Sequence, residues 1–297
     1  MNSEATEQNY PRRILSLHVF GWLLVIFCYR FYSNALLHQL HQPVLISPEI
    51  DNTYWAFHLL QIPEWVTRHF ATAFDMILVA LIIACIFFSR IWVLPLGLAI
   101  LLWTYYITFN TFAGHHYYQV GFLFMVIPFI AKGEKSFTIL FDAVRYYCCF
   151  MYTSSGLYKL FRGSVFHGEQ MQSILMNDNA SAMYSNHPDS ILYLIQHPSL
   201  AQALFVCAAF IQLAMLLGFF TKKFDLWLLG GLVLFHISNY FLLGIPFLEQ
   251  GVIFLVLIPK EKMKKLCVGR KLKYFRKQIS RFVVDNESKL LFKVRKR

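Results

Sequence analysis

Residues 200–220 read LAQALFVCAAFIQLAMLLGFF and contain no charged side chain. Crossing the hydrocarbon core of a bilayer as an α-helix takes roughly 20 predominantly apolar residues, so this segment is long enough to span a membrane. The whole chain has the same character, with 57% hydrophobic and 14% charged residues over 297 positions. Soluble domains carry roughly 25% charged residues. The sequence therefore predicts an all-α, polytopic transmembrane helical bundle.

Similar apolar stretches recur along the chain and predict about eight spans, of which the fourth and the eighth are short. They are residues 14–37, 66–88, 91–109, 117–130, 137–160, 200–220, 224–243 and 245–258. The polar stretch 164–198 predicts short helices on the outer face. We expect one transmembrane domain over residues 14–259, preceded by a segment of residues 1–13 and followed by a basic tail of residues 260–297.

The net charge of +11 is concentrated in this tail. Fifteen Lys and Arg stand there against Glu261, Asp285 and Glu287, which gives +12 and leaves −1 for the rest of the chain. A basic segment directly after a membrane span is typical of contact with an anionic cytoplasmic leaflet. Nucleic acid is the alternative partner for such a segment. We expect membrane lipids as the partner, and no nucleic acid.

The loops also differ in charge from one side of the expected bundle to the other. Residues 34–64 and 110–116 contain no Lys or Arg, whereas the loops expected on the opposite side carry Arg90, Lys132, Lys135, Lys222 and Lys223. By the positive-inside rule this pattern predicts a cell-membrane protein with both termini in the cytoplasm. On the inner side, Asp142 and Arg145 are three residues apart on one helix, and we expect them to pair locally.

Lys159 is the most unusual residue of the outer half. It lies in YTSSGLYKL, residues 152–160, at the end of an apolar run. An ionisable side chain at membrane depth is costly unless it is paired, hydrated or used, so it is a functional-site candidate. The alternative is a lysine that extends to the interface. His236 and Glu249 are also in the outer half, with an interhelical hydrogen bond and a polar partner as their structural alternatives.

Three motifs in order extend this reading: HHYYQVG at 115–121, SGLYKL at 155–160 followed by FHGEQM at 166–171, and FHISN at 235–239. Over residues 14–259 their order and spacing resemble the transmembrane domain of vitamin K-dependent gamma-carboxylases, which occurs alone in many bacteria as the HTTM domain. The resemblance implies an outward-facing site in which Lys159 is the base that deprotonates a reduced quinone, of the vitamin K or menaquinone kind. It implies that His116 assists the chemistry that follows, in which the oxygenated quinol removes a glutamate proton and CO2 adds.

Around these two catalytic candidates, the substrate-binding or cofactor-binding candidates are His115, Tyr118, Tyr158, His236, Asn239 and Glu249. Tyr158 stands where the family motif often has a second lysine. To act as a base, Lys159 must be uncharged, and burial among apolar neighbours would favour that form. We expect no metal site, because the six cysteines show no CxxC pair and the histidine pairs lack a third ligand at a fitting spacing.

Three classes of function stay open. The first is a quinol-dependent oxygenase or carboxylase-like enzyme, in which Lys159, His116 and His236 line one apolar cavity. The second is a non-enzymatic membrane factor for the maturation or export of a secreted peptide or protein, with Lys159 pointing to solvent. The third is a small-molecule or lipid transporter, with polar residues continuing through both leaflets.

Overall fold

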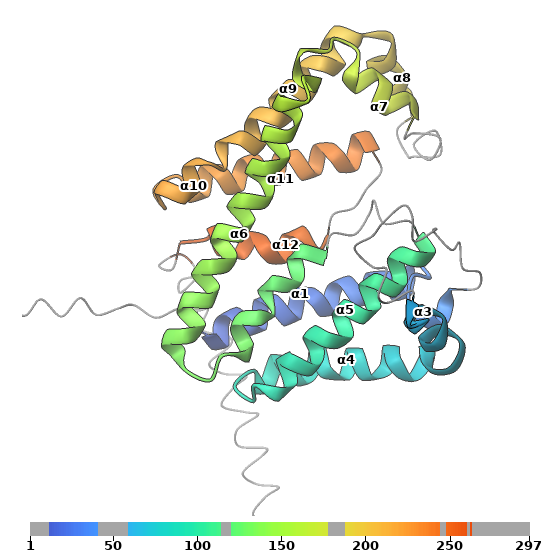
Figure 1. Ribbon diagram of the computed structural model, residues 1–297, viewed down its shortest axis with the longest axis vertical. Coiled ribbons are helices and arrows are strands. Elements are labelled where there is room, and N and C mark those ends of the chain that lie inside the picture. Colours follow the sequence, from blue (N-terminus) through green and yellow to red (C-terminus); the bar gives the residue numbers. More distant parts are fainter. Residues whose placement is uncertain are drawn as a thin grey trace, which may run out of the picture. The chain divides into compact units, whose positions relative to one another are not determined.

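The computed structural model describes residues 12–40, 59–113, 120–177, 188–243, 248–259 and 262. All regular structure in these residues is helical, which confirms the predicted all-α class (Figure 1). The chain divides into two compact units, Met1–Ile258 and Pro259–Arg297. Every helix named below belongs to the first unit.

The α-helices follow one another with short 3₁₀ or π segments between them. In chain order they are α1 (Arg12–Tyr32), η1 (Leu37–Gln39), α3 (Ile62–Trp65), the π segment η3 (Val66–Phe70), α4 (Ala71–Phe88), α5 (Val93–Ala113), η5 (Val120–Met125), η6 (Ile127–Ile130), α6 (Glu134–Phe161), η7 (Ser164–Phe166), α7 (Gln170–Asn177), α8 (Pro188–Gln196), α9 (Pro198–Ala214), α10 (Leu217–Phe220), α11 (Asp225–Leu243), α12 (Gln250–Ile253) and η9 (Phe254–Leu257).

Four helical stretches within the described residues are long and apolar enough to cross a membrane, by length and composition. They are Arg12–Gln39, Ile62–Phe88, Pro198–Phe220 and Asp225–Leu242. The apolar helix Val93–Phe109 is shorter. The four stretches indicate a multi-pass membrane protein, but they do not reproduce the expected number of eight spans.

The fourth and eighth expected spans differ most from the prediction. In their described residues, the first forms η5 and η6, and the second forms α12 followed by η9. The four residues of α12 and the four of η9 reach about 14 Å, which is well short of the ~30 Å hydrocarbon core. Pro128 lies in the first turn of η6. Its missing N–H is tolerated there, but a proline in the interior of a longer helix would break it.

The fifth expected span forms α6, a helix of 28 residues. It is not one of the four spanning candidates, because it combines charged residues, from Glu134 to Lys159, with many Tyr, Ser and Thr residues in its second half. Its buried residues recur every three to four positions and make one continuous stripe. This stripe packs against α9, with η6 and η9 also in contact with α6 (Figure 1). The buried face of α6 is thus covered by other helices of the protein.

Two glycines allow the backbones around α6 to approach closely. A Cβ on Gly156 would lie 3.0 Å from the backbone nitrogen of Leu213 on α9. A Cβ on Gly218, in α10, would lie 2.5 Å from the Sγ of Cys149 on α6. Such distances leave no room for a side chain, so the crossing of α6 with α9 and α10 depends on both glycines.

A buried ion pair fixes the first half of α6. Arg145 is 1% exposed, and its Nε and Nη2 donate to the two carboxylate oxygens of Asp225 at 3.1 and 2.6 Å. Its Nη1 and Nη2 also donate to backbone carbonyls of α10 and the turn that follows it. The expected local pair of Asp142 with Arg145 is wrong, because the bidentate carboxylate comes from α11 and Asp142 accepts from Lys222 at 2.8 Å.

The N-terminal helices form a second packed group, in which α1 contacts α4 and α4 contacts α5. Arg12 begins α1 and is 4% exposed. Its guanidinium donates to the backbone carbonyls of Ser89, Phe129 and Ala131. These carbonyls lie just after α4, within η6 and just after η6. One arginine therefore satisfies backbone carbonyls at helix ends that have no partner within their own helix.

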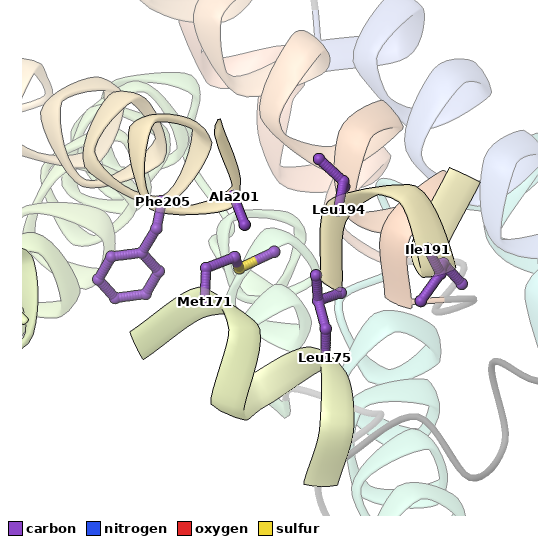
Figure 2. Close-up of a cluster of buried hydrophobic side chains, with 6 residues drawn as sticks. All are labelled: Met171, Leu175, Ile191, Leu194, Ala201 and Phe205. Atoms are coloured by element: carbon purple, nitrogen blue, oxygen red, sulfur yellow. The ribbon is translucent and has the colours of Figure 1, made fainter. Parts of the chain in front are cut away.

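The short helices predicted in residues 164–198 are present as α7 and α8. They pack on the first half of α9 through a small apolar cluster, in which each helix contributes two buried side chains (Figure 2). The cluster consists of Met171, Leu175, Ile191, Leu194, Ala201 and Phe205. This cluster attaches α7 and α8 to the first half of α9, with Val165 and Leu242 packed against it.

Candidate functional site

The side chain of Lys159 is held in place on the last turn of α6. Its Nζ donates to Oε1 of Gln212 at 2.6 Å and to Oγ of Ser155 at 3.1 Å. Lys159 is half-buried, whereas Gln212, on α9, is 4% exposed. The lysine therefore reaches inward to a buried amide, rather than extending away from the bundle as a snorkelling side chain does.

The local sequence explains this geometry. Ser155 and Lys159 are four residues apart, so they lie on the same face of α6, one turn from each other. Gly156 lies next to Ser155 and brings α9 close, since a Cβ there would be 3.2 Å from the Cβ of Gln212. The sequence Ser-Gly-x-x-Lys thus presents a hydroxyl, a close helix contact and an amine to the same part of α9.

The partners of Lys159 are both neutral oxygens. Across the described ranges, the ion pairs join Arg30 with Glu249, His38 with Asp75, Arg90 with Glu134, Arg145 with Asp225 and Lys222 with Asp142. None of these pairs includes Lys159. A hydroxyl and an amide carbonyl accept hydrogen bonds from an amine as well as from an ammonium group, so neither partner restricts the lysine to its charged form.

A second polar cluster lies further back on the same helix. The Tyr152 hydroxyl is 2.7 Å from Nε2 of His236 on α11, and it donates to Oε1 of Gln250 at 3.4 Å. The His236 ring packs against Phe254 at a centroid distance of 5.3 Å and against the Tyr152 ring at 5.8 Å. His236 thus makes the interhelical hydrogen bond that was its structural alternative, within a largely aromatic environment.

A third cluster surrounds Glu249, the residue before Gln250. Its Oε1 pairs with the Arg30 guanidinium and accepts from the Tyr106 hydroxyl at 3.1 Å. The same guanidinium lies over the rings of Tyr106 and Phe109, at 4.9 and 4.7 Å from their centroids. Arg30 and Glu249 are 3% and 4% exposed, so this ion pair is fully enclosed by protein.

Glu249 and Gln250 together form what we call the Glu249–Gln250 junction. The first residue binds side chains of α1 and α5, and the second binds Tyr152 of α6, which contacts His236 of α11. Two adjacent residues therefore connect four helices through buried polar groups. Tyr152 and Lys159 are seven residues apart on one face of α6, which is about 10 Å along the helix axis.

The other predicted site residues divide into two groups. His115, His116 and Tyr118 lie outside the described residues, so the proximity of His116 to Lys159 stays a prediction. Tyr158 is 59% exposed, and the Arg162 guanidinium lies over its ring at 5.2 Å. Asn239 is partly buried on α11, one turn after His236.

None of the partners in these clusters was among the predicted site residues: Ser155, Gln212, Tyr152, Gln250, Arg30 and Tyr106. Gln212 and Arg30 are the most informative of them. Both were visible in the sequence as rare polar residues within apolar stretches, and such residues are costly in a membrane unless they are bonded or used. Arg30 was not predicted because it lies near the end of the first expected span, where a charged side chain is usually an interfacial anchor. Gln212 was not predicted because an uncharged amide in an apolar helix is a weaker indication of a site than a charged lysine.

Comparison of the chain with protein-family models, with curated proteins and with solved structures found no match. The resemblance to carboxylase membrane domains therefore stands on the three sequence motifs.

Proposed function

We propose that this membrane protein binds a lipid-soluble, quinone-like molecule next to Lys159 and uses the lysine amine as a base, in a reaction related to quinol-dependent carboxylation. The observation that carries the proposal is the double hydrogen bond of Lys159 to Ser155 and Gln212, two neutral acceptors. A lysine that served only as an interfacial anchor would not need a buried amide partner.

For such a base we expect a ligand that is mostly apolar and carries an acidic hydroxyl within reach of Lys159 Nζ. Phe161 is 83% exposed and Leu160 is 37% exposed, so the end of α6 that carries Lys159 also presents apolar side chains to its surroundings. When bound, a reduced quinone would supply the oxidisable ring and the acidic hydroxyl. The protein would supply a nitrogen, Lys159 Nζ, that is positioned to take the hydroxyl proton while Ser155 and Gln212 hold it still.

The proposed orientation puts Lys159 at the outer face, with both termini in the cytoplasm. Support for it comes from the charge difference between the loops, because Lys and Arg favour the cytoplasmic side. In that orientation, Arg12 begins α1 at the inner face and Arg30 lies near the outer one.

The proposal is tested with purified protein in lipid nanodiscs. We expect a quinone to co-purify from native membranes, and we expect the wild type to consume oxygen when a reduced menaquinone analogue is added. Lys159→Met removes the base and should reduce this rate by about 100-fold or more, the usual contribution of a general base. Lys135→Met is the matched control, since it removes an exposed lysine from the first turn of the same helix. Equal rates in both variants would rule out the base.

A transporter is the second candidate, favoured by the Glu249–Gln250 junction. Buried charged groups beside short, interrupted helices such as α12 and η9 also occur at the sites of secondary transporters. Accessibility separates the two candidates: a cysteine introduced in place of Asn239 should react with membrane-impermeant thiol reagents from one side in the enzyme and from both sides in a transporter.

A further inference from the structure

Gln212 is a buried amide in one of the most apolar helices of the protein. The stretch Pro198–Phe220 is apolar enough to cross a membrane, and Gln212 is 4% exposed within it. An amide removed from water is destabilising unless it forms hydrogen bonds. Its Oε1 accepts from Lys159 at 2.6 Å and lies 3.5 Å from the Ser155 hydroxyl. The bonds that compensate its burial are therefore made to the candidate base and its neighbour.

The approach of the two helices makes this contact specific. A Cβ at position 156 would lie 3.0 Å from both Cγ and the backbone nitrogen of Leu213, the residue after Gln212. Any side chain at this position would push α6 and α9 apart by a few tenths of an ångström. Lys159 is one turn further along α6 than Ser155, and at this separation its amine and the Gln212 amide meet.

The two acceptors also determine where the reactive position of the nitrogen points. Nζ is bonded to Cε and donates to Ser155 and Gln212, whose oxygens lie 3.5 Å apart on the same side of the nitrogen. In the neutral amine, both hydrogens are donated to these acceptors and the lone pair takes the remaining direction. The lone pair is therefore held away from the two acceptors, where it can take a proton.

We propose that Gln212 is a positioning residue for Lys159: it orients the amine through a neutral carbonyl and leaves the lysine free to gain or lose its proton. The inference rests on the proposed role of Lys159 as a base. A glutamate at position 212 would keep the length and the oxygen but add a charge that favours the ammonium form. Among the elements packed against this end of α6, α9 and η7 carry no charged residue, and Arg162 lies over Tyr158.

The test measures how fast each lysine reacts with a small acylating reagent as a function of pH, by mass spectrometry of the protein in nanodiscs. Only the unprotonated amine reacts, so the pH of half-maximal labelling reports the charge state of Lys159. Lys135 in the same sample is the internal reference, since it is exposed.

We expect Gln212→Glu to raise the half-labelling pH of Lys159 by about one unit or more, because an opposite charge within ~4–6 Å favours the charged form. Gln202→Glu is the matched control on the same helix, where the amide donates to the Val165 carbonyl at 2.9 Å; it should leave Lys159 unchanged. Gln212→Asn, which keeps the amide but shortens its reach, should move the Lys159 profile toward that of Lys135. It also decides the question if the glutamate variant does not fold.

Superimposable Lys159 profiles in the wild type and both Gln212 variants would overturn the inference. This outcome is separable from failure of the proposed function. If no quinol-dependent oxygen uptake occurs but Gln212→Glu shifts the profile, the positioning role holds and the function fails. If oxygen uptake requires Lys159 but the labelling profile of Lys159 is the same in the wild type and the Gln212 variants, only the positioning role fails.

Discussion

Individual polar residues in the described part of this protein are distinguished by the helices they join. Lys159 and Gln212 join α6 to α9, Arg30 and Glu249 join α1 to α12, and Tyr152 with its two partners joins α6 to α11 and α12. Each buried group finds its partner on a helix distant in sequence. In an apolar environment, a polar group whose partner is removed stays both desolvated and unbonded, so single substitutions at these positions should have large effects.

The Arg30–Glu249 pair gives the clearest prediction at this scale. Glu249→Gln removes the carboxylate that pairs with the buried guanidinium, and breaking a buried pair costs about 3–5 kcal/mol. The loss should appear as a lower midpoint of thermal unfolding in detergent, followed by tryptophan fluorescence. Arg90→Met breaks the exposed pair with Glu134, in which the arginine side chain is 84% exposed, and should change the midpoint little. Similar losses in both variants would contradict an enclosed junction.

The same pair also allows a test of whether its charges or its other contacts contribute more to stability. Replacing both members with Met removes both charges together, and a buried pair replaced by apolar residues is often neutral for stability. We therefore expect Arg30→Met with Glu249→Met to recover most of the midpoint lost in Glu249→Gln. A double variant no more stable than the single one would show that the hydrogen bonds to Tyr106 and the aromatic contacts, rather than the charges, dominate the junction.

At the scale of elements, α6 is the helix around which the described site is arranged. Its apolar stripe contacts α9, its first half is bound to Asp225 at the start of α11, and its last turn carries Lys159. The geometry depends on close contact with α9 and α10 at Gly156 and Gly218. Small residues at such crossings are what allow membrane helices to pack, because no difference in hydrophobicity draws apolar helices together within lipid.

Gly218→Ala tests this crossing. The new methyl group would meet Cys149 Sγ at 2.5 Å, and overpacking of this kind destabilises by about 1–3 kcal/mol. Cys149→Ala in the same chain removes the sulfur, leaving the Cys149 Cβ at 3.7 Å from the new methyl group, so the double variant should regain most of the thermal unfolding midpoint. Gly230→Ala is the control, because no atom lies within 4 Å of a Cβ there. A double variant as unstable as Gly218→Ala would refute the proposed clash.

At the scale of the whole molecule, the large apolar side chains that are exposed fit a lipid environment. They include Trp227 at 82% and Phe210 at 64% on α11 and α9, two of the candidate spanning stretches. In water, such a surface would promote association. In a bilayer it is the expected exterior, which is consistent with the membrane assignment drawn from hydropathy.

The proposed sidedness is tested by fusions in a bacterial host. We expect green fluorescent protein fused after Arg297 to fluoresce, because it folds in the cytoplasm, and alkaline phosphatase fused after Asn177 to be active, because it requires the outer compartment. The physical reason is the excess of Lys and Arg expected on the inner side. The opposite pair of results would invert the orientation and move Lys159 to the cytoplasmic face.

The sequence alone determined the helical class, the membrane environment and the short helices after α6. These follow from properties that are local in the chain: a run of apolar residues must bond its backbone internally, and in lipid only a helix does so within one segment. The extents of the first, second, sixth and seventh expected spans overlap the four long apolar stretches of the structure. Lys159 also stood out from the sequence, because a charged residue in an apolar run needs an explanation.

The partners of the polar residues were decided only by the tertiary structure. Arg145 pairs with Asp225 rather than with Asp142, which is nearer in sequence. Lys159 binds Gln212 and Glu249 binds Arg30. These partners are so far apart in the chain that no local sequence pattern predicts them. Hydropathy states how much a segment gains by leaving water, but it does not state which face of a helix meets which other helix. That choice depends on the packing of whole surfaces, including the space left by Gly156 and Gly218, and so it exists only once the helices are assembled.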